Sequence, residues 1–91
     1  MTGSAPGSGA DTSAALTDLV RSMATELVDH PDEVEVSEVP GDQNTVIELR
    51  VARGDIGKVI GKEGRTAQAM RTILTAVAQK LGGRAHLDIV D

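Results

Sequence analysis

Hydrophobic residues follow a helical spacing near the start of the chain. Over residues 14–29 they return every three or four positions, which places them on one side of a helix. Residues 11–13 are of types that cap helix starts. The pair His30 and Pro31 ends the run, because a residue before proline disfavours helical backbone. The apolar side of this predicted helix consists of Leu16, Leu19, Val20, Met23, Leu27 and Val28.

The pattern then changes to alternation, which is typical of strands. Val34 and Val36 alternate with polar residues and predict a short strand. A turn cluster at 40–44 separates it from a second predicted strand at 45–52. One face of that second strand is expected to pack on the core, because every second residue is apolar. These apolar residues are Ile47, Leu49 and Val51.

The second half of the chain predicts two helices and a last strand. Asp55 is placed to cap a short helix, and apolar spacing over 65–81 predicts a long helix that Gly82 and Gly83 end. Alternation over 85–89 predicts the final strand. This order predicts one α+β domain at residues 14–91, with helices packed on one face of a three-stranded sheet. Residues 1–13, rich in Gly and Ser, are predicted to form a flexible tail.

Two glycines three positions apart, Gly61 and Gly64, separate the short helix from the long one. Glycine accepts backbone dihedral angles that a Cβ would block, and it lets another molecule approach the backbone closely. The start of the long helix adds unpaired N–H groups and the positive end of the helix dipole, which favour an anion. The sequence therefore predicts a phosphate-binding loop formed by Gly61, Lys62, Glu63 and Gly64.

Basic and aliphatic residues flank this loop. Lys58 and Arg65 are predicted to steer phosphate towards it, whereas Glu63 weakens its attraction for anions. Ile56 and Ile60 are predicted to floor a narrow groove for bases. The alternative for these two isoleucines is a role in the core, since so short a helix is stable only when packed. The alternative for the loop is a plain turn between helices that binds nothing.

The charge of the chain is unevenly distributed. The net charge of −5 argues against nucleic-acid binding, because Lys and Arg supply most nonspecific affinity for phosphate. However, residues 1–44 hold one base and nine acids, whereas residues 45–91 hold eight bases and five acids. The predicted loop therefore lies in the positive half of the chain, as expected of a local binding face.

Composition excludes several classes of site. The chain has no Phe, Tyr or Trp on which bases could stack, and no Cys for a disulfide, a thiolate metal site or a nucleophile. A nucleotide-binding P-loop is excluded by spacing, because three residues separate Gly57 from Gly61 and Glu63 takes the place of a magnesium-binding hydroxyl. The two histidines are isolated in sequence. We therefore predict no catalytic set, no metal and no cofactor.

Residues 56–65, read as IGKVIGKEGR, resemble the signature of KH domains. In KH domains a Gly-x-x-Gly loop clamps the backbone of about four nucleotides of single-stranded nucleic acid. The predicted order αββααβ is also that of the type II KH fold. The resemblance therefore implies that residues 14–91 form a type II KH domain in which Gly61, Lys62, Glu63 and Gly64 hold the nucleotide backbone.

The chain is also similar to the small bacterial single-KH proteins of the KhpA family, through segments 27–36, 47–52 and 57–65. This resemblance implies a non-catalytic protein that binds single-stranded RNA and acts in post-transcriptional control or as an RNA chaperone, with effects on cell shape. It also implies a homodimer, or a heterodimer with a larger KhpB-type KH protein. The Gly/Ser-rich segment at 1–13 departs from the family pattern.

One alternative function stays open, and it is a KH-like dimerisation scaffold with little RNA binding of its own and the loop at its interface. For the location of the protein, we find no signal peptide and no apolar run long enough to span a membrane. We therefore expect a cytoplasmic protein without a membrane partner.

Overall fold

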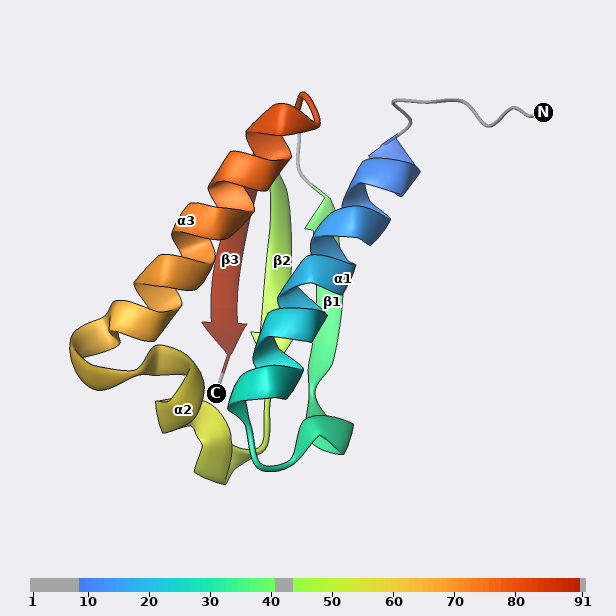
Figure 1. The fold of residues 1–91 in the computed structure, drawn as a ribbon. Coiled ribbons are helices and arrows are strands. Elements are labelled where there is room, and N and C mark those ends of the chain that lie inside the picture. The colour runs from blue at the N-terminus through green and yellow to red at the C-terminus, as the bar shows by residue number, and fades with distance from the viewer. Residues whose placement is uncertain (1–8, 41–43, 91) are drawn as a thin grey trace.

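The computed structural model describes residues 9–40 and 44–90 of the 91-residue chain. Within these ranges the elements follow the predicted order, which confirms the α+β arrangement (Figure 1). The helices and strands are α1 (Gly9–Leu27), β1 (Glu35–Pro40), β2 (Thr45–Arg50), α2 (Ile56–Ile60), α3 (Arg65–Lys80) and β3 (Ala85–Val90). Single-turn 3-10 helices join them at Pro31–Glu33, Arg53–Asp55 and Lys62–Gly64.

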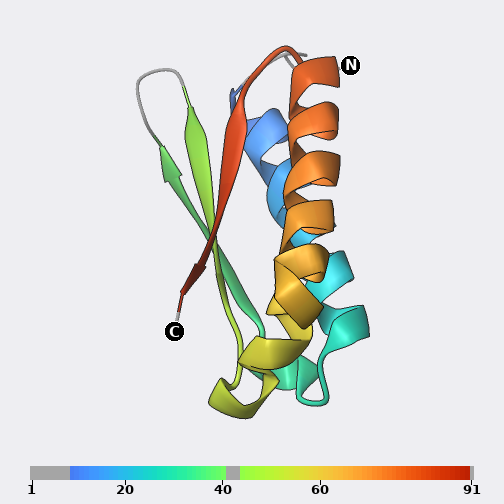
Figure 2. The same cartoon turned by 90° about the vertical axis from the view of Figure 1, so that its left-hand side faces the viewer.

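The three strands form one mixed sheet in the order β1-β2-β3. β1 and β2 pair antiparallel, whereas β2 and β3 pair parallel, with Ile47 opposite Leu87. A parallel pair needs a long crossover, and the α2–α3 segment supplies it. Figure 2 shows the α-helices on one side of the sheet, as the sequence predicts. β3 is therefore an edge strand that lies beside α3.

The core is made entirely of aliphatic side chains and one methionine. Its members come from both long helices and from the sheet, with the central strand β2 supplying Ile47 and Leu49. Each large aliphatic side chain contributes about 1.5–3 kcal/mol when it is fully buried. The largest buried apolar side chains are Leu16, Val20, Ile47, Leu49, Val59, Leu74 and Leu87.

Helix α1 begins earlier than the sequence pattern predicts. It starts at Gly9 and not near residue 14, so residues 9–13 of the predicted flexible tail are helical. The chain has no proline between Pro6 and Pro31, so no proline ring interrupts the helix in this stretch. The rest of the predicted tail, residues 1–8, lies outside the described residues, as do residues 41–43 of the predicted turn cluster.

The glycine pair after α3 ends the helix as predicted. Gly82 has a φ of 84°, its amide donates to the carbonyl of Gln79 at 3.1 Å, and the amide of Gly83 donates to the carbonyl of Ala78 at 2.9 Å. This is the Schellman arrangement, in which a left-handed residue satisfies the last carbonyls of a helix. The chain is thereby turned back so that β3 can run beside α3.

Replacing Leu74 by Ala should destabilise the domain by about 2–5 kcal/mol, because it leaves a cavity in the core. Leu74 is fully buried, whereas the neighbouring Ile73 is 44% exposed. The matched control Ile73→Ala should therefore cost less than about 1 kcal/mol. Urea denaturation followed by circular dichroism measures both losses. Equal losses would show that α3 does not pack through the face described.

Candidate nucleic-acid interface

The loop between α2 and α3 has an unusual backbone. Gly61 has a φ of 78°, Glu63 of 58° and Gly64 of 75°, all in a region that side chains with a Cβ rarely adopt. At Gly61 a Cβ would also lie 2.6 Å from the Cβ of Thr66 and clash with its hydroxyl. Glycine is therefore required at position 61 by both its dihedral angles and its close packing.

The amides of this loop differ in their hydrogen bonds. The amide of Gly61 donates to Gly57 at 2.9 Å and that of Gly64 donates to Gly61 at 3.1 Å. The amide of Arg65 donates to the carbonyl of Lys62. None of the turn or cap hydrogen bonds of the described residues uses the amide of Lys62 or Glu63. The loop therefore satisfies the amides of Gly61, Gly64 and Arg65 internally.

The charged side chains of the loop differ in their availability. The carboxylate of Glu63 lies 3.2 Å from the guanidinium of Arg65, and both side chains are exposed. Such a surface ion pair contributes little to stability, but it offsets two opposite charges locally. Lys62 is exposed and forms no ion pair within the part of the chain that the structure describes. Lys62 is therefore the cation that the loop offers to an anion.

Lys58 does not face the loop with the other predicted residues. Its ammonium lies 3.3 Å from Asp29 and 3.8 Å from Asp55, towards the turn between α1 and β1. Ile56 and Ile60, one helical turn apart, share a different side of α2. The structure thus brings Lys62 and Arg65 together at the loop and directs Lys58 elsewhere.

Ile56 lies between the core and the surface. It is half-buried and packs against the core, and it also lines a hollow of about 470 Å³. Arg50, Val51 and Arg53 complete the lining of this hollow. The two arginines were not among the predicted site residues, although they belong to the basic stretch that the charge distribution shows. Ile60 is half-buried beside the loop.

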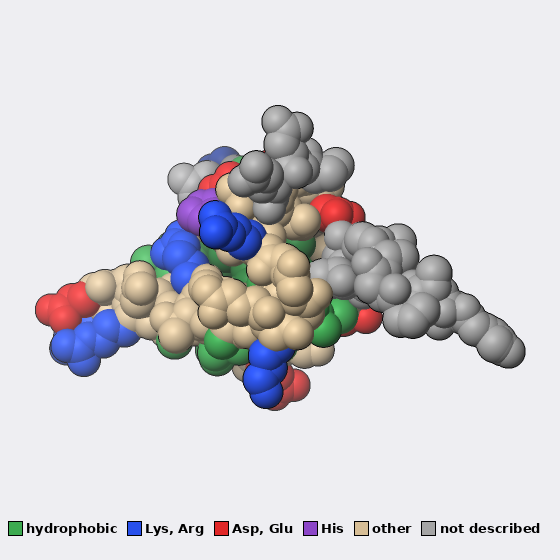
Figure 3. Space-filling view, turned by 90° about the horizontal axis from the view of Figure 1, so that it is seen from above, with side chains coloured by type: hydrophobic (Ala, Val, Ile, Leu, Met, Phe, Trp, Pro, Cys, Tyr) green, Lys and Arg blue, Asp and Glu red, His purple; other side chains and the backbone are tan. Residues whose placement is uncertain are grey.

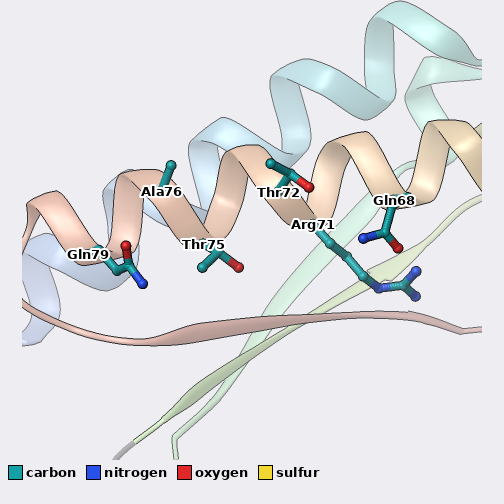
Figure 4. Close-up of a pocket in the computed structure, with 6 residues that line it drawn as sticks. All are labelled: Gln68, Arg71, Thr72, Thr75, Ala76 and Gln79. Atoms are coloured by element: carbon teal, nitrogen blue, oxygen red, sulfur yellow. The ribbon is translucent and has the colours of Figure 1, made fainter.

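A second hollow of about 370 Å³ lies along α3 (Figure 4). Its lining is polar and includes Arg71, whose Nε donates to the carbonyl oxygen of Leu87 on β3 at 3.4 Å. The guanidinium is therefore held at the seam between α3 and β3. Arg71 is another basic residue that the sequence pattern did not assign to the site. The lining residues are Gln68, Arg71, Thr72, Thr75, Ala76 and Gln79.

A buried carboxylate fixes the short helix that leads into the loop. Asp55 is 1% exposed, and its Oδ2 accepts hydrogen bonds from the backbone amide of His30 at 3.0 Å and lies 3.1 Å from the ring Nδ1 of His30. The prediction that Asp55 caps α2 through its side chain is wrong, because the carboxylate turns towards His30 instead. This tertiary contact joins positions 25 residues apart.

The pair shifts the protonation of both partners. Burial acts to raise the pKa of Asp55, but hydrogen bonds from the side chain and backbone of His30 outweigh it and lower that pKa below the ordinary value. The hydrogen bond with Asp55 and the charge of its carboxylate raise the pKa of His30. The side chain of His30 is 56% exposed, whereas that of Asp55 is 1% exposed.

Comparison with known proteins decides the family. A family model described as "KhpA/KhpB, KH domain" matches residues 17–89. The chain is 53% identical over 77 residues to the RNA-binding protein KhpA of Aquifex aeolicus, covering 85% of this chain and 98% of the relative. It is 51% identical over 72 residues to the RNA-binding protein KhpA of Clostridium acetobutylicum, covering 79% and 96%. The chain belongs to the KhpA/KhpB KH family.

Solved structures of Era resemble this KH domain in fold. The structure of Aquifex aeolicus Era bound to GDP·AlF4− has a TM-score of 0.57 and 23% identity, covering 82% of this chain and 29% of that one. A structure of Era with MgGDPNP and nucleotides 1506–1542 of 16S ribosomal RNA has a TM-score of 0.56 and 23% identity, covering 81% and 28%. The KH domain thus spans under a third of each Era chain.

Residues 9–40 and 44–90 of the KH domain lack two further features. No three His, Cys, Asp or Glu side chains come together as metal ligands would. No helix there is long and apolar enough to cross a membrane.

Replacing Gly61 by Ala should destabilise the KH domain by about 1–3 kcal/mol, because alanine must adopt a positive φ against Thr66. Gly57→Ala is the matched control, since a Cβ at Gly57 meets nothing within 4 Å. In a helix that change should be neutral or stabilising by up to about 1 kcal/mol. Thermal unfolding measures both variants. A Gly61→Ala protein as stable as the parent would mean that the loop relaxes to another backbone.

The His30–Asp55 pair predicts a pH dependence of stability. Because the pKa of folded His30 is raised above 6.5, the pair stabilises fully below that value and loses its effect as the pH rises through the raised pKa. Because the pKa of folded Asp55 is lowered below 3.8, its contribution is present above that value and is lost as the pH falls through the lowered pKa. Stability from this pair is therefore greatest between the two.

Urea denaturation at about pH 5.5 and about pH 8.5 tests this dependence. The parent should lose more stability on raising the pH than His30→Gln, which keeps the backbone amide but has no titrating ring. His86→Gln, on the exposed side of β3, should behave as the parent does. The same loss in all three proteins would rule out the His30 ring as its origin.

Proposed function

We propose that this KH domain binds the backbone of single-stranded RNA through residues 61–64. The observation that carries the proposal is the exposed ammonium of Lys62, which forms no ion pair among the described residues and stands on a loop whose turn and cap hydrogen bonds do not use the amides of Lys62 and Glu63. Backbone amides and a lysine together suit a phosphate oxygen, since charge-assisted hydrogen bonds are about twice as strong as neutral ones. The glycines on each side let the nucleotide backbone come close.

The bases then lie on an aliphatic surface beside the loop. Ile56 reaches the hollow that Arg50 and Arg53 border, and Ile60 is half-buried on the same side of α2. In the absence of aromatic rings, aliphatic contact replaces the stacking that many RNA-binding proteins use. Because the whole chain carries a charge of −5, affinity is modest and falls as salt is added.

The domain acts without catalysis, as a post-transcriptional regulator or RNA chaperone in the cytoplasm, and it pairs with itself or with a KhpB-type KH protein. The names of its relatives, RNA-binding protein KhpA, support the RNA-binding part of this role. Pairing is supported by physical argument, because two weak sites on one dimer gain avidity that a single site lacks.

A dimerisation scaffold is the second candidate. It is favoured by large apolar side chains that are exposed in the described residues, namely Leu27, Val39, Ile73 and Leu81. None of these four belongs to the loop. The two candidates therefore place RNA and partner on different surfaces, and they can be separated by changing the loop.

The double substitution Lys62→Asp with Glu63→Asp should weaken binding of short single-stranded RNA by about tenfold or more, because one charge-assisted phosphate contact contributes roughly 1.5–3 kcal/mol. A gel shift or fluorescence anisotropy measures this loss. The helical circular dichroism and the mass in solution should stay unchanged, since both side chains are exposed.

Lys80→Asp changes the charge equally at the end of α3 and serves as the control, with RNA affinity expected near that of the parent. A parent protein that forms a dimer but binds no RNA, with the dimer kept in the loop variant, would instead support the scaffold.

A further inference from the structure

Four titratable side chains join the turn after α1 to the start of α2. The Oδ2 of Asp55 accepts a hydrogen bond from the amide of His30 at 3.0 Å and lies 3.1 Å from the ring Nδ1 of the same residue. The ammonium of Lys58 lies 3.3 Å from Asp29 and 3.8 Å from Asp55. Figure 1 shows this turn beside α2 at the lower end of the molecule. We call these four residues the α1–α2 charge cluster.

The glycine loop is attached to the element that this cluster holds. Helix α2 has five residues, of which Val59 alone is buried, and so short a helix is stable only through tertiary contacts. The amide of Gly61 donates to the carbonyl of Gly57 at 2.9 Å, which joins the first residue of the loop to α2. A displacement of α2 therefore displaces the loop and the ammonium of Lys62 with it.

His30 is the member of the cluster whose charge changes near neutral pH. Its ring is exposed to solvent, whereas the carboxylate of Asp55 is enclosed. The charged groups that act on the ring are Asp55, Glu33 in the 3-10 helix that follows, and Asp29, and all three raise the pKa of His30. Lys58 is the cation that faces the same two aspartates from α2.

Protonation of His30 changes the strength of the contact with Asp55. When the ring is charged, the carboxylate of Asp55 lies between two cations, His30 and Lys58. When the ring is neutral, its Nδ1–H can still donate, but a hydrogen bond without a charged donor is weaker. Helix α2 is then held less firmly. A ligand that needs one position of the loop must first order it, and its apparent affinity falls.

We propose that His30 and Asp55 are positioning residues for the RNA-binding loop, and that RNA binds more tightly when the ring of His30 is protonated. The two residues act through α2, whose position they set, and they make no contact with the RNA. This inference rests on the proposed function, because the position of the loop affects RNA binding only if the loop binds RNA.

Fluorescence anisotropy with a short single-stranded RNA, measured from about pH 5.5 to about pH 8, tests the proposal. Affinity should fall about threefold as the pH rises through the raised pKa of His30, as expected for a partly exposed ion pair. His30→Gln keeps the amide and a side-chain donor but cannot titrate, so its affinity should change by less than about 1.5-fold. Circular dichroism restricts the comparison to conditions in which each protein is folded.

His86 is the other histidine of the chain and gives the matched control. It is the second residue of β3, which begins at the opposite end of the molecule from α2 (Figure 1). Figure 3 views that end and shows a histidine beside Lys or Arg side chains. His86→Gln should keep the pH dependence of the parent. Loss of the dependence in His86→Gln, or its persistence in His30→Gln, would overturn the proposal.

A second measurement separates positioning from direct contact of His30 with RNA. By linkage, RNA must lower the acid dissociation constant of His30 by the same factor, about threefold, by which protonation strengthens binding. NMR titration of the His30 ring with and without RNA measures this change. Asp55→Asn keeps an oxygen acceptor without the charge, so the change should disappear in that variant. A change that persists there would show that the ring itself contacts RNA and would overturn the proposal.

The inference and the proposed function fail in different ways. If the parent binds no RNA at any pH, the proposed function of the loop fails and the inference fails with it. If the parent binds RNA equally at every pH, while Lys62→Asp with Glu63→Asp abolishes binding, only the role of His30 and Asp55 fails. Because His30→Gln changes an exposed side chain, this comparison remains decisive even if Asp55→Asn does not fold.

Discussion

The contact between Asp55 and His30 constrains the position of α2 and of the glycine loop that follows it. A carboxylate buried without hydrogen bonds would be strongly unfavourable, so the turn after α1 and the start of α2 must meet. Helix α2 has only five residues and cannot be stable alone. Its place, and with it the position of the loop that follows, depends on this contact and on the burial of Val59.

Because α2 is held in place, the backbone of the loop that follows it has little conformational freedom. Gly61 packs against Thr66 at the beginning of α3, and three of four consecutive loop residues have a positive φ. Internal hydrogen bonds satisfy the amides of Gly61, Gly64 and Arg65, whereas none of the turn or cap bonds of the described residues uses those of Lys62 and Glu63. The loop therefore holds its donors in place before any ligand arrives, which reduces the entropy lost on binding.

The helices also separate two kinds of surface. The faces of α1 and α3 that meet the sheet bury an aliphatic core, whereas polar and basic side chains line the hollows on the outer side of α3 and near the start of β3. A net charge of −5 describes neither surface, because screening limits charge effects to about 10 Å at moderate salt. For the attraction of an anion to this protein, the local arrangement of Arg50, Arg53, Arg71 and Arg84 therefore matters more than the net charge.

The sequence by itself determined the order of the elements, the core-facing residues of β2, the pair of glycines that ends α3 and the glycine loop. These features are local, since they follow from hydrophobic periodicity and from the dihedral freedom of glycine. The hydrophobic spacing predicts too late a start for α1. A run of Gly, Ser and Ala has only weak secondary-structure preferences, which do not mark where a helix begins.

Only the tertiary structure decided which charges face which surface. It turned Asp55 from a helix cap into a partner of His30, paired Lys58 with Asp29, and brought Arg71 to the edge of β3. Each of these contacts joins residues distant in sequence, and periodicity carries no information about such pairs. The physical reason is that side-chain direction and burial are set by the packing of whole elements, which no single segment specifies.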